Sequence, residues 1–220
     1  MKILVSLETK QSIEVADRIV DYVDGFKINH LLWDEIIAWP DDWAKNLKKE
    51  LFVDFKLWDT PNTVETVVKK IIDRGGTMAS ICAHNSQETF ERLKNLSDQI
   101  KLVGVASLTS WDLETERAVT NRVSYDVWNL AMNKLRRYNF QHLVCPVTDL
   151  KLIQSIDFSG PEKFSYIYPG IVFEKETSGQ TRTGSPKEAK EGGANYIVLG
   201  RTVTEAENPN EVLVKIKGTL

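Results

Sequence analysis

The chain has 220 residues, of which 42% are hydrophobic and 27% are charged, and its formal net charge is −3. These values are ordinary for a globular protein of this size, and they argue against a nucleic-acid-binding protein, which normally carries a basic patch. A small anion is not excluded, because a local cluster of donors can oppose the overall sign of the charge.

The few cysteines and histidines do not form a metal-binding pattern. Cys82 and Cys145 lie in apolar runs without Cys-x-x-Cys spacing, so we expect buried, reduced thiols and no structural zinc. Residues 1–10 become polar too soon for a signal peptide, and no apolar run reaches membrane length. We therefore expect a cytoplasmic protein that contacts neither membrane nor nucleic acid.

Short runs rich in β-forming residues alternate with segments of helical period. Because the β runs are nearly continuously apolar, they are typical of parallel strands that are covered by helices. Eight such units predict a single-domain (β/α)₈ TIM barrel over residues 1–220 rather than an open α/β sheet. The predicted strands are Ile3–Leu7, Gly25–Ile28, Leu51–Lys56, Met78–Ala83, Lys101–Leu108, His142–Cys145, Phe164–Tyr168 and Asn195–Leu199.

The helices between these strands are indicated by apolar spacing and by start signals. Val64, Val68 and Ile71 recur with the period of a helix. The run Ser-Pro-Lys-Glu at 185–188 combines an N-cap serine, a first-turn proline and a capping-box glutamate. Asn208 followed by proline opens the last predicted helix.

Charged residues gather where the third predicted strand ends. Asp54 and Lys56 are two apart on a strand, so their side chains point to the same side. Asp59 follows just past the strand, and Lys27, at the end of the preceding strand, is placed to join them. Because unpaired charges are costly to remove from water, four such groups on the face where barrel enzymes build their sites favour a catalytic role over a structural ion pair.

A fixed carboxylate beside an ammonium group suits a decarboxylation. Asp54 would repel a substrate carboxylate about 4 Å away by roughly 1 kcal/mol in water and about 4 kcal/mol at an effective dielectric constant near 20. Lys56 would favour the carbanion that forms when CO₂ leaves, and would then donate the proton that replaces it.

The residues after the seventh and eighth predicted strands indicate a phosphate site. The connection from Val172 to Thr183 is long and polar, as is typical of a loop that covers a site. Gly200 lets the backbone approach an anion closely, and Arg201 can give two parallel hydrogen bonds to phosphate oxygens. Loops in these two positions form the recurrent phosphate site of barrels.

These features together resemble the orotidine 5′-monophosphate decarboxylase family. The run Asp54-x-Lys56-x-x-Asp59-x-Pro61-Asn62-Thr63 is similar to the signature of that family. The similarity continues in Gly-Phe-Lys-Ile at 25–28 and in residues 108–110, 169–170, 180–182 and 200–201. The resemblance implies a homodimer that converts orotidine 5′-monophosphate to uridine 5′-monophosphate without a metal or cofactor, in the last step of de novo pyrimidine nucleotide synthesis.

The resemblance also implies a role for each candidate residue. Lys56 would protonate C6 of the pyrimidine, Asp54 would crowd the substrate carboxylate, and Lys27 would join the charge network and contact the ribose. Asp59 and Thr63 would reach into the site of the partner subunit. The other implied substrate contacts are Glu8 near the ribose, Thr109 or Ser110 at the pyrimidine, Gln180 between phosphate and base, Gly200 and Arg201 at the phosphate, and also Pro169 and Gly170.

Three residues depart from the pattern of the family. Glu8 stands where an aspartate usually contacts the ribose, so this contact is expected to shift or to be lost. Thr60 stands where a branched apolar residue commonly borders the carboxylate pocket, and Trp58 is larger than expected beside the charged residues.

Two other functions fit part of the pattern. Magnesium-dependent sugar-phosphate enzymes of the same suprafamily, 3-keto-L-gulonate 6-phosphate decarboxylase and hexulose-6-phosphate synthase, share Asp-x-Lys-x-x-Asp. They typically carry a glutamate in place of Lys27 and lack Pro-Asn-Thr after the final aspartate. A non-catalytic nucleotide-binding barrel is the second alternative, and the presence of both Asp54 and Lys56 argues against it.

Overall fold

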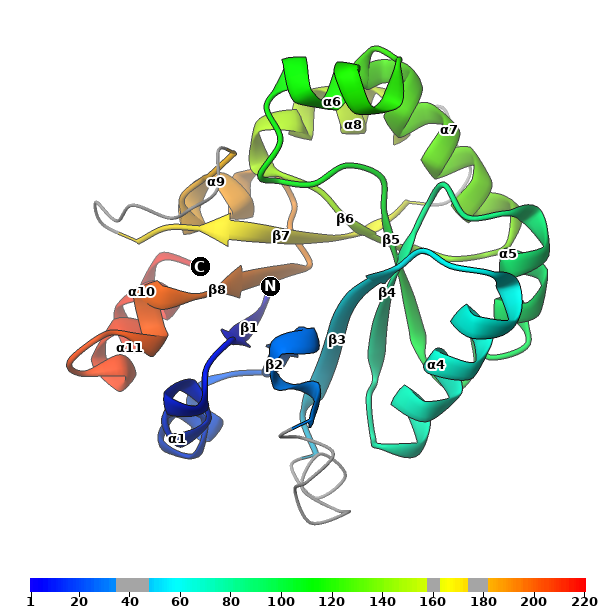
Figure 1. Cartoon of the computed structure of the whole chain (residues 1–220). Coiled ribbons are helices and arrows are strands. Elements are labelled where there is room, and N and C mark those ends of the chain that lie inside the picture. The colour runs from blue at the N-terminus through cyan, green and yellow to red at the C-terminus, as the bar shows by residue number, and fades with distance from the viewer. Residues whose placement is uncertain (35–47, 158–162, 174–181) are drawn as a thin grey trace.

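The computed structural model describes residues 1–34, 48–157, 163–173 and 182–220. In this part of the chain, eight parallel strands close into a barrel in sequence order, and β1 pairs with β8 (Figure 1). The predicted (β/α)₈ barrel is thus confirmed. That one domain spans residues 1–220 stays a prediction.

The strands lie close to their predicted positions. Two of them differ by three residues at the C-terminal end, since β5 stops at Val105 instead of Leu108 and β7 continues past Tyr168 to Ile171, and the other ends agree within one residue. The register of β7 against β8 shifts after Tyr168, and this irregularity accommodates Pro169, which has no N–H to donate to a regular ladder. The strands are β1 Lys2–Leu7, β2 Gly25–Ile28, β3 Glu50–Leu57, β4 Met78–Cys82, β5 Lys101–Val105, β6 His142–Val144, β7 Ser165–Ile171 and β8 Tyr196–Leu199.

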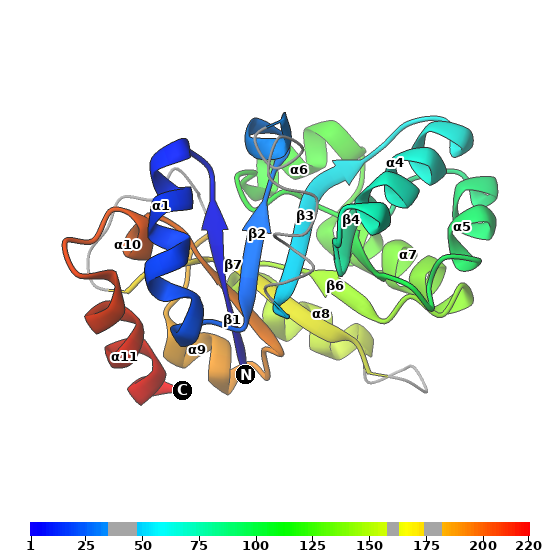
Figure 2. The same cartoon turned by 90° about the horizontal axis from the view of Figure 1, so that it is seen from below.

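Helices follow the strands and cover the outside of the barrel, with α1 and α11 on one side and α4 and α5 on the other (Figures 1 and 2). The predicted capping box is confirmed, because Ser185 Oγ accepts the Glu188 N–H and the Glu188 carboxylate accepts the Ser185 N–H. The helices are α1 Lys10–Ile19, α4 Pro61–Asp73, α5 Gln87–Lys94, α6 Leu113–Thr120, α7 Ser124–Arg137, α8 Leu150–Asp157, α9 Pro186–Glu191, α10 Arg201–Thr204 and α11 Pro209–Thr219, with 3₁₀ turns at η1 Val20–Tyr22, η2 His30–Leu32 and η3 Val147–Asp149.

The apolar strands build two hydrophobic layers. On β3, Phe52 belongs to the cluster inside the barrel, whereas Leu51 and Val53 pack in the larger cluster between strands and helices. This double burial explains why the strands lack a polar face. Burial on β3 decreases after Val53, so the C-terminal end of the strand opens into the space where the charged residues lie.

The structure also tests the expectations on cysteines and membrane segments. Both cysteines are free, and Cys145 is buried as expected, whereas Cys82 is partly exposed. Among the described residues, no helix is long and apolar enough to cross a membrane.

An ion-pair cluster stabilises the N-terminal end of the barrel. Glu50 pairs with Lys2 at 3.1 Å and with Lys101, and it accepts a hydrogen bond from Thr77 Oγ1 at 2.9 Å. Burial raises the pKa of Glu50, but the hydrogen bonds from the two lysines and the threonine outweigh it and lower the pKa from 4.5 to about 2. The ionised carboxylate therefore stabilises the folded state.

We expect Glu50→Gln to lose about 1–2 kcal/mol of unfolding free energy near pH 7, less than the full value of a pKa shift from 4.5 to about 2, because the two lysines are 49% and 36% exposed and solvent screens the pairs. Because the folded-state pKa is depressed, this contribution is present above pH 4.5 and is lost as the pH falls toward 2. Chemical denaturation should show that the free energies of unfolding of wild type and Glu50→Gln differ most at neutral pH and become equal in acid. Equal stability at neutral pH would contradict the assignment.

Candidate active site

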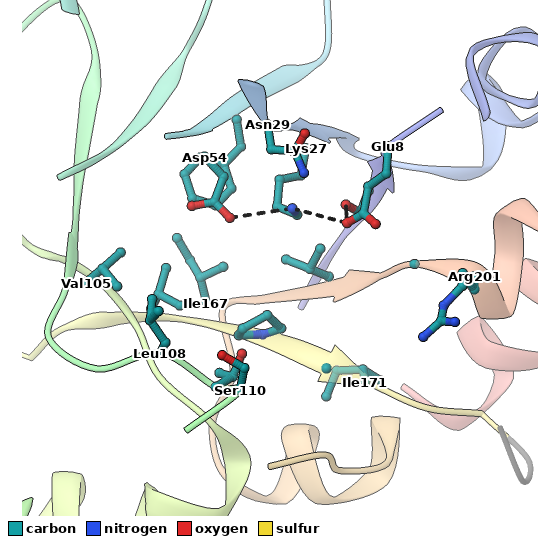
Figure 3. Close-up of a pocket in the computed structure, with 18 of the residues that line it drawn as sticks. Glu8, Lys27, Asn29, Asp54, Val105, Leu108, Ser110, Ile167, Ile171 and Arg201 are labelled. Atoms are coloured by element: carbon teal, nitrogen blue, oxygen red, sulfur yellow. Dashed lines mark hydrogen bonds and ion pairs between the residues drawn. The ribbon is translucent and has the colours of Figure 1, made fainter. Parts of the chain in front are cut away.

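A pocket of about 900 Å³ lies at the C-terminal end of the barrel. Its lining residues lie on or just after seven of the strands, all but β4, and its floor is apolar (Figure 3). Val105, Val144, Ile167 and Val198 form this floor, and all four belong to the hydrophobic cluster inside the barrel. The pocket therefore lies where the sequence predicts a barrel enzyme to place its site.

The structure brings most of the predicted site residues together in this pocket. Two of them, Asp59 and Thr63, are exposed and lie outside it, and Gln180 lies outside the described residues. The predicted residues that line the pocket are Glu8, Lys27, Asp54, Lys56, Thr109, Ser110, Pro169, Gly170, Gly200 and Arg201.

The four charged residues at one side of the pocket, Glu8, Lys27, Asp54 and Lys56, form a continuous network, called the charge cluster below. Lys56 Nζ donates to Asp54 Oδ2 at 2.8 Å. Lys27 Nζ lies 3.5 Å from the same oxygen and 3.9 Å from Glu8 Oε1 (Figure 3). The expectation that Lys27 joins Asp54 and Lys56 is confirmed, and Glu8 extends the network toward β1.

The end of β3 leaves the regular strand conformation to form this cluster. Lys56 has φ +50, in the left-handed region that is costly for residues with a Cβ, and the pairing of β3 with β4 shifts register between Val53 and Leu57. Backbone strain of this kind is concentrated at functional sites. The prediction that Asp54 and Lys56 point to the same side assumed a regular strand. The strand is irregular at Lys56, and it is this irregular backbone that lets the two side chains meet.

Ser80 on β4 supports this conformation, and sequence analysis missed it. Its hydroxyl accepts the backbone N–H of Lys56 at 2.7 Å and donates to Asp54 Oδ1 at 2.8 Å. Ser80 is fully buried, and a lone hydroxyl in an otherwise apolar strand is the only sequence signal that could have pointed to it. A single buried hydroxyl thus orients both the carboxylate and the strained backbone.

The electrostatics of the cluster keep Asp54 ionised. Burial raises the pKa of Asp54, but the positive charges of Lys27 and Lys56 outweigh burial and hold the pKa below its ordinary value of 3.8. The Lys27 side chain is 10% exposed, whereas that of Lys56 is 41% exposed and faces the open pocket. Lys56 is therefore the ammonium group that is accessible to a bound molecule.

The opposite side of the pocket offers a cation and open space. Figure 3 shows Arg201 apart from Asp54, on the β8 side of the pocket. Within the described ranges, its exposed guanidinium has no ion-pair partner, although Glu205 lines the pocket one helical turn further on. Nothing lies within 4 Å of where a Cβ of Gly200 would be, so an anion could approach the backbone there.

The β5 side of the pocket supplies hydroxyl groups. Thr109 and Ser110 follow β5, where the Trp111 N–H closes a turn on the Leu108 carbonyl at 3.0 Å. Ser107, also missed by sequence analysis, is 3% exposed, and its hydroxyl has no hydrogen-bond partner in the described part of the protein. This wall is suited to polar groups of a bound molecule.

The start of α4 places the remaining motif residues on the outer rim. Thr60 donates its N–H to Asp59 Oδ1 at 2.6 Å, and its hydroxyl lies 2.9 Å from that of Thr63. Thr60 does not line the pocket of its own chain, and the Trp58 side chain is 75% exposed. The two departures of the motif from the family pattern thus lie outside the charge cluster.

Comparisons with known proteins agree with this architecture. A family model described as Orotidine 5′-phosphate decarboxylase / HUMPS family matches residues 1–216. Orotidine 5′-phosphate decarboxylase of Streptococcus gordonii is 33% identical, with 88% of this chain and 83% of the relative covered. The protein of the same name from Dictyoglomus turgidum is 28% identical, with 97% and 91% covered. A crystal structure of that enzyme from Lactobacillus acidophilus has a TM-score of 0.77 at 23% identity, with 99% and 98% covered, and supports the fold.

Proposed function

This chain belongs to the Orotidine 5′-phosphate decarboxylase / HUMPS family, and we propose that it converts orotidine 5′-monophosphate to uridine 5′-monophosphate and CO₂ in pyrimidine nucleotide synthesis. The observation that carries the proposal is Asp54, a buried, ionised carboxylate that is held by Lys27 and Lys56 at the edge of an apolar floor. The two relatives that are similar in sequence over most of the chain carry the name of this activity.

The proposed reaction uses the charge cluster in two ways. The substrate carboxylate at C6 lies beside Asp54, where repulsion between like charges and the apolar floor disfavour it relative to neutral CO₂. When the C6–carboxyl bond breaks, its electron pair stays on C6, and the adjacent Lys56 ammonium stabilises that charge. Lys56 then transfers a proton to C6, which completes the product, and regains a proton from solvent.

The proposed substrate orientation follows from the two ends of the pocket. In this orientation C6 lies beside Lys56, and the ribose points toward Lys27 and Glu8. The hydroxyls after β5, at Thr109 and Ser110, are placed to bind the polar edge of the pyrimidine. The phosphate lies toward Gly200 and Arg201, with Pro169 and Gly170 of β7 completing that wall.

The alternative magnesium-dependent reaction on a sugar phosphate is disfavoured by the contacts of Asp54. Lys27 Nζ lies 3.5 Å from its Oδ2, so an ammonium group stands where the magnesium-dependent enzymes typically carry a glutamate, and the carboxylate ligand that a magnesium ion would use there is replaced by a positive charge. The loss of the ultraviolet absorbance of orotidine 5′-monophosphate, measured with excess chelator, tests the proposal. Rapid turnover in chelator is expected, and turnover only of ketogulonate or hexulose phosphates with magnesium would contradict it.

Arg201→Ala is expected to raise KM about 10- to 100-fold with a smaller change in kcat, because charge-assisted hydrogen bonds to the phosphate contribute about 1.5–3 kcal/mol. Steady-state kinetics check this split. Arg201→Lys keeps the charge but not the two parallel hydrogen bonds, so its KM should lie between those of wild type and Arg201→Ala. An unchanged KM in the alanine variant would place the phosphate elsewhere.

We also propose that two copies of the chain form a homodimer in which Asp59 and Thr63 complete the pocket of the partner. Both residues are exposed and lie outside the pocket of their own chain. The Trp58 indole beside them is 75% exposed, and a large aromatic side chain in this position suits an interface between protein subunits.

Mixing two inactive variants tests the shared site. Lys56→Ala and Asp59→Ala are each expected to be inactive, but their mixture should regain about a quarter of wild-type activity, since half of the randomly formed dimers hold one intact pocket. The control is a mixture of Lys56→Ala with Asp54→Ala, whose lesions lie in the same pocket, and it should stay inactive. A Lys56→Ala and Asp59→Ala mixture that exchanges subunits without regaining activity would rule out the shared site.

A further inference from the structure

A buried ion-pair cluster lies outside the charge cluster and has no part in the proposed reaction. Arg182 Nη1 donates to Asp149 Oδ2 at 2.7 Å, and both Nη1 and Nη2 lie 3.4 Å from Glu116 Oε2. The exposed fractions of the three side chains are 7%, 8% and 1% for Arg182, Asp149 and Glu116. One guanidinium thus holds two carboxylates away from solvent.

These three residues come from three different connections at the C-terminal end of the barrel. Glu116 lies in α6 after β5, Asp149 ends η3 after β6, and Arg182 lies in the connection after β7. Further donors complete the cluster, because Trp128 Nε1 donates to Asp149 Oδ2 at 3.2 Å and the Ser124 hydroxyl donates to Glu116. The planar guanidinium therefore links three neighbouring βα connections, and this set of side chains is called the Arg182 brace below.

The backbone of Arg182 connects this brace to the pocket wall. Its N–H donates to the carbonyl of Thr109 at 3.2 Å. Two residues later, the Gly184 N–H donates to the Gly170 carbonyl at 3.2 Å, and the Gly184 carbonyl accepts the Val172 N–H at 2.9 Å. Thr109, Gly170 and Val172 all line the pocket. The side chain of Arg182 thus fixes a segment that bonds directly to two walls of the site.

We propose that Arg182 is a positioning residue that holds the Thr109–Ser110 wall in the place where it binds the pyrimidine. The identity of the ligand in this statement rests on the proposed function. Without the guanidinium, Glu116 and Asp149 would be buried together without a counter-charge, and one would take up a proton or the connections would separate. Either response displaces the backbone of Thr109 most, because its carbonyl accepts the Arg182 N–H directly. The wall at Gly170 is bonded two residues later, through Gly184, and Arg201 and Gly200 lie beyond these three connections.

Two variants and a matched control test the proposal. Arg182→Lys keeps the charge but loses the planar fork, and Glu116→Gln keeps the side-chain volume if the lysine variant folds poorly. The control is Arg136→Lys, because Arg136 also forms a partly buried pair, with Asp157 at 2.7 Å, and does not line the pocket. A general loss of packing would affect all three proteins alike.

The first measurement needs no ligand. Amide hydrogen exchange of residues 108–112 should become faster in Arg182→Lys and in Glu116→Gln than in wild type, and should stay unchanged in Arg136→Lys. If residues 108–112 exchange no faster in Arg182→Lys and Glu116→Gln than in Arg136→Lys, the proposal is wrong, whatever reaction the chain catalyses.

The second measurement distinguishes binding of the pyrimidine base from binding of the phosphate. The dissociation constant of uridine 5′-monophosphate should rise about 10- to 100-fold in Arg182→Lys, while that of ribose 5-phosphate should change less than about twofold. Equal weakening of both ligands, or of neither, would contradict the positioning role. Wild-type protein that binds neither ligand and does not consume orotidine 5′-monophosphate would refute the proposed function. The hydrogen-exchange measurement would then still test whether Arg182 holds the Thr109–Ser110 segment in place.

Discussion

Lys56→Ala is expected to lower kcat about 10⁴-fold, since the variant loses both the proton donor for C6 and the cation beside the developing negative charge. The structure supplies the reason that no neighbouring group replaces it. Lys27 is 10% exposed and engaged with Asp54 and Glu8, whereas the Lys56 ammonium faces the open pocket. Single-turnover measurement of uridine 5′-monophosphate formation checks the loss.

The matched control for Lys56 is Lys69→Ala, because Lys69 also forms a short ion pair, with Glu65 at 2.6 Å on the surface of α4. Its removal should leave kcat unchanged. The Lys56 variant should still bind uridine 5′-monophosphate, since the phosphate and base contacts are elsewhere in the pocket. A Lys56→Ala protein that keeps a tenth or more of wild-type activity would remove Lys56 from the chemical step.

Asp54→Ala is expected to separate catalysis from binding. Its kcat should fall about 10²- to 10⁴-fold, because the variant loses the fixed charge that orients Lys56 and repels the substrate carboxylate. Affinity for orotidine 5′-monophosphate should rise relative to uridine 5′-monophosphate by at least about tenfold, since only the substrate carries the carboxylate that Asp54 repels. Lys27 and Lys56 would then be free to pair with it.

Calorimetric titration of the two nucleotides against wild type and Asp54→Ala measures this change. Asp54→Asn is a useful comparison, because it keeps a hydrogen-bonding group beside Ser80 while removing the charge. If the affinity for both nucleotides falls by the same factor, Asp54 only maintains the shape of the pocket, and repulsion between Asp54 and the substrate carboxylate is negligible.

The barrel could be predicted because its signals are local. Apolar runs, helical spacing and the capping box at Ser185 each depend on residues close in sequence, and each has its expected place in the fold. Three members of the charge cluster could be predicted for a similar reason. Asp54 and Lys56 belong to one strand, and Lys27 lies one residue before the end of the neighbouring parallel strand, so the topology brings these strand ends together. The fourth predicted member, Asp59, lies outside the pocket, and Glu8 takes part instead.

The contacts that sequence analysis missed depend on residues distant in the chain. Ser80 orients Lys56 across 24 positions, and Arg182 reaches Glu116 across 66. No periodicity or spacing connects such pairs, because only the folded chain brings neighbouring strands and their connections side by side. The left-handed backbone of Lys56 was equally hidden, since a lysine at a strand end carries no signal for positive φ.

The release of CO₂ from orotidine 5′-monophosphate labelled at its carboxyl carbon tests the central claim most directly, in wild-type protein with excess chelator. We predict that labelled CO₂ and uridine 5′-monophosphate form in equal amounts and that Lys56→Ala abolishes both. Folded wild-type protein that leaves the nucleotide intact, yet releases CO₂ from a ketogulonate phosphate once magnesium is added, would contradict the account.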